Sequence, residues 1–560
     1  MFTNFHSTAC DVLVIGAGLA GLTAAAEAAR AGKKTIVVSK NHPLKSHSAA
    51  AAGGINAALS ADDCTAHCEE TIAAGCGLCD RNAVEILCQS AADIISRFRK
   101  YGTPFNLNGN GDPEGRPFGA MSAPRTRFVK DHTGAALMQT AFEQAEKAGA
   151  CFEYDIFFID LIKDGSRITG AYGIRLQTGT VELFSAGAVI LASGGAGALF
   201  EVNSNGIGST GDGFAMALRA GIPLKNWELV QFHPTGLYPS GFLISEAARG
   251  EGAVLRNKDM EAFMERYHEK GDLAPRDVVT RAILTEIRCG RGFGRRGDFV
   301  VLDCRAVSPE RLRERLPEIC DLTETMLHIH PSTHLIPVIP TAHYFMGGVA
   351  TDNDGRVLDG IAFPVPGLYA AGECTWTGVH GANRVGGNSL LEAAVFGRRA
   401  GKTAAEESLP PPPPTTDAVQ ILNTRFEPFT GSTEPDEESK SITPLECRRE
   451  LKEILSTSCG AVHTTIRHKQ GATRLSLLER RFRKYRFRLP PERACNTELK
   501  DWLETDNLLL LGAALLTAAE ERSESAGAFY REDQIYAGGS LYHTLTEYRK
   551  GRFSAERRPL

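Results

Sequence analysis

The chain has 560 residues, of which 42% are hydrophobic and 23% are charged, a composition typical of a soluble globular protein of about two to four domains. The formal net charge of −5 gives no reason to expect a nucleic-acid partner, and the 14 cysteines are too scattered to indicate a disulfide framework. The longest apolar run, residues 508–516, is too short to span a bilayer, and the first predicted strand begins at Asp11, which leaves no room for a secretory signal. We therefore expect a chain that is soluble or peripheral to a membrane, in a reducing compartment.

A dinucleotide-binding fingerprint opens the chain. Residues 11–15 are predicted to form a buried parallel strand, residues 22–30 a helix and residues 35–38 a second strand. Between the first strand and the helix stand the three glycines of a Gly-x-Gly-x-x-Gly pattern, Gly16, Gly18 and Gly21. The first glycine allows a tight turn, the second lets a pyrophosphate approach the backbone, and the third lets helix and strand pack closely. This pattern predicts a bound nucleotide cofactor.

The residues after the second strand favour FAD over NAD. Ser39 and Lys40 occupy the place where an NAD site is expected to have a ribose-binding acid. Farther along, residues 367–373 read as a strand that ends in a glycine and Glu373, a pattern common in FAD proteins.

His47 is the most informative single residue. It lies shortly after the fingerprint, on a loop of small residues that ends in Gly53 and Gly54. A histidine delivered to that position predicts a flavin that is covalently tethered.

Five later segments each place an arginine or a histidine beside glycine or proline, in residues 232–236, 245–252, 274–279, 342–348 and 380–390. Rigid turns of this kind bring charged groups to a cleft. Their donors are His233, Arg249, Arg276, His343 and Arg384. Gathered in one cleft, these groups are suited to a small dianion, because the planar fork of arginine matches a carboxylate.

Two other clusters predict no separate chemistry. Cys64, Cys68, Cys76 and Cys79 lie close together, but their spacing matches no standard zinc or iron–sulfur pattern, so we expect no metal site. The basic, aromatic segment 480–488 is expected to be a solvated or partner-facing side of a helix.

The predicted fold class is α/β, with a Rossmann-type FAD-binding domain, an inserted α+β capping domain and a C-terminal helical domain. The run of five prolines at 410–414 marks a stiff linker, and residues 440–520 show helical periodicity. The expected boundaries are 1–235 and 344–408 for the FAD-binding domain, 236–343 for the capping domain, 409–439 for the Pro-rich linker and 440–560 for the helical C-terminal domain.

The order and spacing of these motifs resemble the flavoprotein subunits of succinate dehydrogenase and fumarate reductase, from about residue 9 to 405 and more weakly to the C-terminus. In that family a Ser-His-x-x-x-x-x-Gly-Gly motif supplies the histidine that is joined to the flavin, which corresponds to His47, and a Ser-Lys pair stands where this chain has Ser39 and Lys40. The resemblance implies further cofactor contacts at Asp212, Glu373, Asn388, Ser389 and Leu390.

The resemblance also implies the reaction. Succinate and fumarate would be interconverted by hydride transfer to or from FAD bound covalently through His47. The substrate-binding residues would be His233, Ser245, His343 and Arg384. Arg276 would transfer the proton, with Glu246 and Arg249 as its relay.

The partners implied are a small dicarboxylate substrate, an iron–sulfur subunit and a membrane or haem subunit. The sequence has no iron–sulfur cysteine pattern, haem motif or membrane span of its own, so electrons must leave through another molecule. A cytoplasmic location is expected, peripheral on the inner face of the cell membrane through those partners.

L-aspartate oxidase is the nearest alternative, since it shares the arginine and histidine set. Such enzymes bind FAD non-covalently and lack a histidine at the position of His47. They also carry a glutamate for the substrate ammonium where this chain has Phe118. A phenylalanine cannot pair with an ammonium group, which favours the dicarboxylate reaction. An alternative of another class is a non-catalytic FAD-binding or assembly module.

Overall fold

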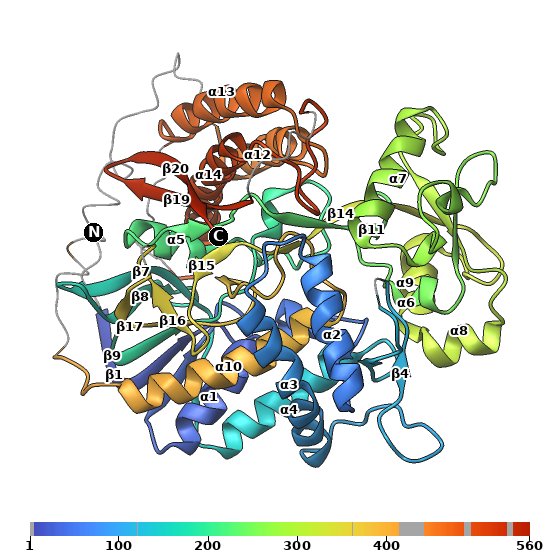
Figure 1. Cartoon of the computed structure of the whole chain (residues 1–560). Coiled ribbons are helices and arrows are strands. Elements are labelled where there is room, and N and C mark those ends of the chain that lie inside the picture. Colours follow the sequence, from blue (N-terminus) through green and yellow to red (C-terminus); the bar gives the residue numbers. More distant parts are fainter. Residues whose placement is uncertain are drawn as a thin grey trace.

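The computed structural model describes residues 5–119, 121–360, 362–413, 420, 442–485, 494–534 and 541–560. Most of the predicted linker 409–439 and residues 486–488 of the basic segment lie outside these ranges. Figure 1 shows a large body built around a sheet and a smaller lobe, which carries helices α6 to α9 and stands to one side of the body.

The sheet of the body is built around the fingerprint strand. β1 (Phe5–Ile15) pairs in parallel with β2 (Thr35–Val38) on one side and with β9 (Val181–Leu191) on the other. All of β2 and β9 is buried, as expected for parallel strands covered on both faces. The sheet also contains β6 (Cys151–Glu153), β7 (Ile156–Asp164), β8 (Arg167–Arg175), β16 (Arg356–Leu358) and β17 (Pro364–Ala370).

Helices cover one face of this sheet. α1 (Leu19–Arg30) and α10 (Asn388–Glu407) pack against each other and both contact the sheet, and a Cβ at Gly397 of α10 would lie 2.3 Å from Oγ1 of Thr23 in α1. The close approach of these two helices therefore needs glycine. Beside them lie α2 (Ala61–Ala74), α3 (Arg81–Lys100) and α4 (Thr133–Lys147). A small sheet of β3 (Ile55–Asn56), β4 (Gly115–Arg116) and β5 (Thr126–Arg127) completes this side.

The lobe, called the capping lobe below (residues 236–343), is joined to the body through two long antiparallel strands. β11 (Val230–Leu237) runs from the body into the lobe, and β14 (Ile336–Phe345) returns from the lobe to the body (Figure 1). There they join a sheet with β12 (Val254–Arg256) and β13 (Val300–Asp303). The lobe has a hydrophobic core of its own, and its helices are α6 (Ala247–Gly250), α7 (Arg276–Arg288), α8 (Pro309–Arg315) and α9 (Pro317–Leu327).

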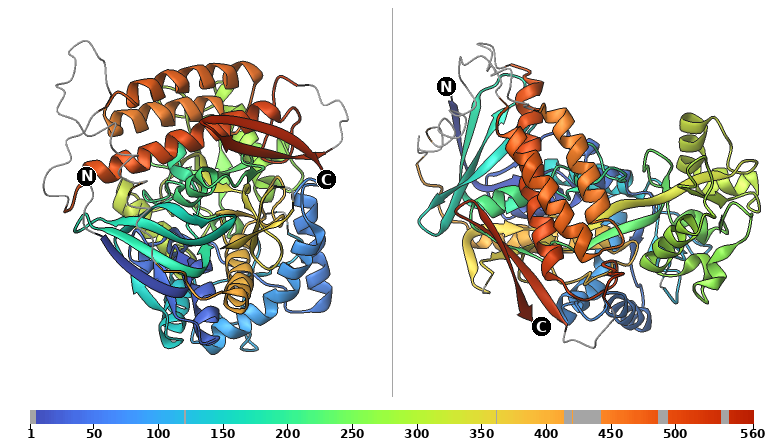
Figure 2. Two further views of the ribbon diagram at one scale, coloured as in Figure 1. Left: turned by 90° about the vertical axis from the view of Figure 1, so that its left-hand side faces the viewer. Right: turned by 90° about the horizontal axis from the view of Figure 1, so that it is seen from above.

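The C-terminal part is helical only in its first two thirds. Three helices pack side by side on the body (Figure 2): α12 (Pro444–Ser458), α13 (Thr465–Phe482) and α14 (Thr497–Glu521). Residues 542–559, which were expected to be helical, instead form a hairpin of β19 (Tyr542–Arg549) and β20 (Arg552–Pro559). Lys550 and Gly551 both have positive φ at its turn, which suits a tight hairpin turn. This Lys-Gly turn is the signal that the helical prediction overlooked.

The hairpin extends a mixed sheet of short strands from the body. β19 pairs with β10 (Leu224–Lys225), which continues to β15 (Gly348–Ala350) and β18 (Thr375–Trp376). α5 (Asp212–Arg219) lies between this sheet and the main one. Throughout the described ranges, no helix combines the length and apolar character needed to cross a membrane.

Candidate active site

A cavity of about 640 Å³ is lined by both the body and the capping lobe. This volume lies within the range of about 300–1,000 Å³ that is usual for small-molecule and cofactor sites. Most of the predicted site residues line it, namely Gly16, Gly18, Ser39, Lys40, His47, Gly53, Gly54, Asp212, His233, Ser245, Glu246, Arg276, His343, Glu373, Arg384, Ser389 and Leu390.

Three predicted residues do not line the cavity. A Cβ at Gly21 would lie 2.0 Å from the carbonyl oxygen of Gly16, so Gly21 serves the close packing of helix and strand. The side chain of Asn388 is fully buried and bonded to Asn56, His67 and Thr71, at 2.7, 2.9 and 3.0 Å. This amide is therefore part of the protein interior. The third residue, Arg249, lies behind the cavity wall.

The glycine region of the cavity, formed around Gly16, Gly18, Lys40 and Asp212, offers an open helix end. α1 begins directly after Gly18, which has no side chain to cap the helix. The backbone N–H of Leu19 donates to Oγ of Ser48 at 3.3 Å. Free N–H groups and the helix dipole favour an anion at this end, and a pyrophosphate is the group that the fingerprint predicts there.

Lys40 ties the glycine region to the C-terminal helices. Its Nζ donates to Thr210 at 2.8 Å and to the carboxylates of Asp212 and Glu504 at 2.9 Å each. Burial alone would lower the pKa of Lys40, but the two carboxylates outweigh burial and raise this pKa above its usual value. Glu504 belongs to α14 and was not predicted, because nothing local in sequence links it to Lys40.

His47 is the first residue of a short 3₁₀ helix, His47–Ala50. Its Nε2 lies 3.2 Å from the amide nitrogen of Asn205, which also donates to the carbonyl of His343. Burial, helped by the charge of Arg384, lowers the pKa of His47 to about 4. The imidazole is therefore neutral at physiological pH, as a ring nitrogen that forms a bond to carbon must be.

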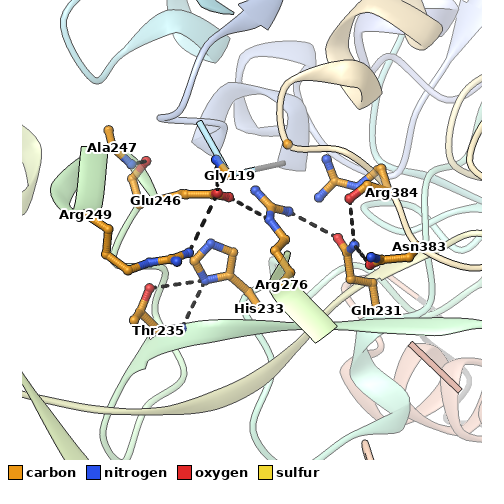
Figure 3. A network of polar contacts seen from close by, with 12 residues as sticks. Gly119, Gln231, His233, Thr235, Glu246, Ala247, Arg249, Arg276, Asn383 and Arg384 are labelled. Carbon is orange, nitrogen blue, oxygen red and sulfur yellow. Dashed lines mark hydrogen bonds and ion pairs between the residues drawn. The ribbon is translucent and has the colours of Figure 1, made fainter. Parts of the chain in front are cut away.

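Figure 3 shows a buried carboxylate held between two guanidinium groups. Nε of Arg276, at the start of α7, donates to Oε2 of Glu246 at 2.8 Å. Oε1 of Glu246 accepts the backbone N–H of Gly119 at 2.7 Å and lies 3.8 Å from Nη2 of Arg249. Burial would raise the pKa of Glu246, but the two arginines hold this pKa below its usual value. Glu246 is thus anionic, and it links Arg276 to Arg249.

Gln231 and Asn383 complete this network and were missed by the sequence analysis. Oε1 of Gln231 accepts from Nη1 of Arg276 at 3.1 Å. Its amide nitrogen donates to Asn383 at 2.9 Å and to the carbonyl of Arg384 at 2.8 Å. The available signal was the place of Gln231 directly before the predicted segment 232–236, and its burial in β11 explains why its amide needs partners.

Arg384 is buried with little to neutralise its charge. Its guanidinium lies over the ring of Tyr344 at 4.5 Å, and Nη1 donates to Oγ of Ser389 at 3.1 Å. Its Nε is buried and has no hydrogen-bond acceptor among the described residues. Burial, with the charge of Arg276, lowers the pKa of Arg384 to about 9, so the group remains charged at neutral pH.

His233 and His343 face each other, with ring centroids 5.2 Å apart. Nδ1 of His233 accepts the backbone N–H of Thr235 at 3.2 Å, whereas its Nε2 is buried and unpaired within the described part of the chain. Burial and the neighbouring arginines hold the pKa of both histidines well below the usual value, so both are neutral. The buried hydroxyl of Ser245 lies on the same cavity wall.

This part of the site is therefore electropositive and has few hydrogen-bond acceptors. It is called the arginine region below and consists of Glu246, Arg249, Arg276 and Arg384. One carboxylate stands against three guanidinium groups, and several buried donors have no partner among the described residues. Unpaired buried donors are costly unless a ligand satisfies them. A small anion with several oxygen atoms fits this arrangement.

Comparisons with known proteins agree with this geometry. Residues 11–390 match the family described as "FAD binding domain", and residues 448–559 match "Fumarate reductase flavoprotein C-term". The succinate dehydrogenase flavoprotein subunit of Coxiella burnetii is 38% identical over 541 residues, covering 93% of this chain and 91% of that protein. The fumarate reductase flavoprotein subunit of a Serratia species is 36% identical over 560 residues, covering 96% of this chain and 92% of that protein.

Solved structures extend the likeness to the fold. A flavoprotein chain of E. coli quinol fumarate reductase superposes with a TM-score of 0.92 at 32% identity, covering 99% of this chain and 97% of that one. Mycobacterium smegmatis Sdh1 gives a TM-score of 0.85 at 33% identity, covering 99% of this chain and 94% of that one. The chain therefore belongs to the FAD-binding family of succinate dehydrogenase and fumarate reductase flavoprotein subunits.

Proposed function

We propose that this chain is the catalytic flavoprotein subunit that interconverts succinate and fumarate, exchanging electrons with an iron–sulfur partner subunit. The observation that carries the proposal is the arginine region, where buried donors without partners share one cavity with the glycine region. A bound flavin supplies the acceptor or donor of the hydride. A module that only bound FAD would have no use for a dianion site.

The residues that hold the substrate are proposed to be His233, Ser245, His343 and Arg384, which all line the cavity. Neutral imidazoles and a hydroxyl donate hydrogen bonds, and the guanidinium of Arg384 supplies a charge-assisted contact to a carboxylate. A dicarboxylate replaces the water that these buried donors otherwise need. Its two ends are matched by donors from both the body and the capping lobe.

Proton transfer is proposed to run through Arg276. This guanidinium lines the cavity, and its other partners are Glu246 and Gln231. Glu246 connects it to Arg249, whose Nη1 donates to the carbonyl of Asp272. A guanidinium normally keeps its proton in proteins, so the proposed role rests on the position of Arg276 between the cavity and the buried carboxylate of Glu246.

His47 is proposed to carry the flavin covalently. Its neutral imidazole lines the cavity beside Asn205, and the open N-terminus of α1 is suited to the pyrophosphate of the same cofactor. Glu373, whose pKa is raised to about 7 by burial, and the first turn of α10 with Ser389 and Leu390 complete the cofactor-facing wall. Tethering prevents loss of the cofactor.

The test is a pair of measurements on the purified flavin-containing protein. Flavin absorbance should stay with the protein after acid precipitation, and succinate should be oxidised with an artificial electron acceptor in a reaction that malonate inhibits. The variant His47→Ser should release its flavin on denaturation and retain fumarate reduction better than succinate oxidation. A colourless acid precipitate from the wild type, together with no turnover, would refute both the tether and the enzyme.

The alternative substrate, L-aspartate, is disfavoured by Phe118. Its ring is 3% exposed, lines the cavity and packs so tightly that a Cβ at Gly53 would lie 2.8 Å from it. An ammonium group placed there would be buried without a partner, which is costly. L-aspartate should therefore give no turnover under conditions in which succinate is oxidised.

Electrons are proposed to leave through the iron–sulfur partner, and the chain is proposed to be cytoplasmic and peripheral on the inner face of the membrane through a membrane or haem subunit. A matched solved structure supports this proposal, since it is a quinol-fumarate reductase with menaquinol molecules. Co-purification of the tagged chain with a subunit carrying iron–sulfur clusters is the expected result.

A further inference from the structure

A cluster of possible metal ligands lies outside the proposed catalytic residues, where the body meets the capping lobe. Asp131 and His132 directly precede α4 of the body, and Glu318 lies in the first turn of α9 of the lobe. These three residues, called the boundary cluster below, each offer one ligand atom, and the three atoms lie within 4.8 Å of one another. The sequence spacing of 187 residues between Asp131 and Glu318 hid the cluster from motif analysis.

Asp131 is fully buried and only half satisfied. Its Oδ2 accepts the backbone N–H groups of Glu318 and Ile319, at 2.8 and 3.2 Å, and so caps the start of α9. Its Oδ1 accepts no hydrogen bond from the described residues. Nε2 of His132 lies 3.7 Å from this oxygen. A buried carboxylate oxygen without a donor is costly, and it points to a ligand that the protein chain itself does not supply.

The other two side chains approach from solvent, and the imidazole of His132 turns Nε2 toward Asp131 and Nδ1 toward Glu318. The side chains of His132 and Glu318 are each 45% exposed, and Nδ1 of His132 lies 3.8 Å from Oε2 of Glu318. Within the described residues, neither carboxylate of the cluster forms an ion pair with a lysine or arginine. Asp321 adds a further negative charge near Glu318. The carboxylates therefore outnumber the single imidazole and are open to a cation from solvent, although the buried guanidinium of Arg116 offsets part of the negative charge of Asp131.

We propose that the boundary cluster binds one divalent first-row transition-metal cation through an imidazole nitrogen and two carboxylate oxygens. Imidazole and carboxylate ligands are the combination that such cations accept. Bonds of about 2.1 Å place ligands about 3.4 Å apart around a four-coordinate cation, so the three ligand atoms, which lie within 4.8 Å of one another, must approach by up to about 1.4 Å when the cation binds. Water completes the coordination.

The site lies between two parts of the molecule that the strands β11 and β14 also connect, together with contacts such as the ion pair of Arg315 with Glu114. Asp131 anchors the body side, and Glu318, which also lines the cavity, anchors the lobe side. A bound cation therefore fastens the cavity wall to the body. The proposal does not depend on the substrate of the neighbouring cavity and is tested without measuring activity.

The probe is Mn²⁺, which has little affinity for the chain's many free thiols. Chelator-treated flavin-containing protein is titrated with Mn²⁺, and the free ion is followed by its electron paramagnetic resonance signal. The wild type should bind one Mn²⁺. The variants His132→Ala and Glu318→Gln should each bind it roughly tenfold more weakly or worse, because even indirect changes to a metal site reduce the affinity about 10–100-fold. Mn²⁺ should also raise the unfolding temperature of the wild type and not of these variants.

Matched controls are His334→Ala and Glu310→Gln, which change exposed residues of the same lobe and should retain wild-type Mn²⁺ binding. Both site variants alter half-exposed side chains, so they leave the buried cap of α9 by Asp131 in place. Equal Mn²⁺ affinity in the wild type, His132→Ala and Glu318→Gln would overturn the proposal. So would a wild type that binds no Mn²⁺ at millimolar concentration.

Discussion

The glycine and arginine regions of the cavity are both buried and both charged, but they differ in whether their charged groups are paired within the protein. In the glycine region Lys40 donates to three acceptors, including Asp212 and Glu504. In the arginine region Nε of Arg384 has no partner among the described residues, and neither has Nε2 of the adjacent His233. The charge of Lys40 is paired within the protein, whereas the surplus positive charge of the arginine region is paired only when an anion binds.

This difference separates stability from catalysis. Removing one partner of a buried ion pair lowers the stability of the fold, because the remaining charge is left uncompensated. Crowded arginines with few acceptors instead work against folding, and such sites persist because function needs them. Substitutions in the glycine region should therefore change stability, and substitutions in the arginine region should change turnover or substrate affinity.

The strongest test of this contrast is Arg276→Lys. Lysine keeps the charge but lacks the planar fork through which Arg276 donates to Glu246 from Nε and to Gln231 from Nη1. We expect turnover to fall by about a thousandfold or more, which corresponds to about 4 kcal/mol in activation free energy, while dicarboxylate affinity changes by less than about tenfold. Steady-state kinetics and malonate binding measure the two effects. The control is Arg288→Lys at the exposed end of the same helix. A wild-type rate would remove Arg276 from proton transfer.

Glu504→Gln tests the glycine region. This substitution removes a carboxylate that pairs with both Lys40 and Arg448. The free energy of unfolding should fall by about 3 kcal/mol, the usual cost of breaking a buried ion pair, with kcat of the folded enzyme unchanged. Urea unfolding at pH 7 measures the loss, and Glu520→Gln, exposed on the same helix, is the control. A variant of normal stability but reduced kcat would reverse the comparison.

Arg384→Lys should act mainly on substrate affinity. The guanidinium over Tyr344 presents a planar fork to a carboxylate, and an ammonium group cannot reproduce two parallel contacts. We expect KM for succinate to rise about 10–100-fold, or about 1.4–2.8 kcal/mol, with a smaller change in kcat. An unchanged KM would mean that Arg384 does not contact the substrate.

The smallest effect concerns pH. Burial and the arginines hold the pKa values of His233 and His343 well below 6.5, so both rings stay neutral as the pH falls from 8 through 6.5. We therefore expect that no change in kcat/KM of the wild type near pH 6.5 comes from His343. The kcat/KM profiles of the wild type and of His343→Gln should have the same shape over this pH range. If a step near pH 6.5 is present in the wild type and absent from the variant, the arginine region is less electropositive than the structure indicates.

The local motifs were predictable because each of them consists of residues that are close together in the sequence. The fingerprint turn of Gly16 and Gly18, the loop of His47, and the arginines Arg276 and Arg384 all line the cavity. The partners that complete them were not predictable. Gln231 and Glu504 carry no motif, and a side chain such as Asn388 can serve the interior although its neighbours Ser389 and Leu390 face the cavity.

The amino-acid sequence by itself determined the cofactor class, the order of the elements and the inventory of donors for a small dianion. Only the tertiary structure decided which donors are paired, which remain without acceptors, and that Asp131 and Glu318 meet across the boundary between body and lobe. The reason is physical. Backbone turns and helix ends depend on neighbours in sequence, whereas burial and charge pairing depend on neighbours in space.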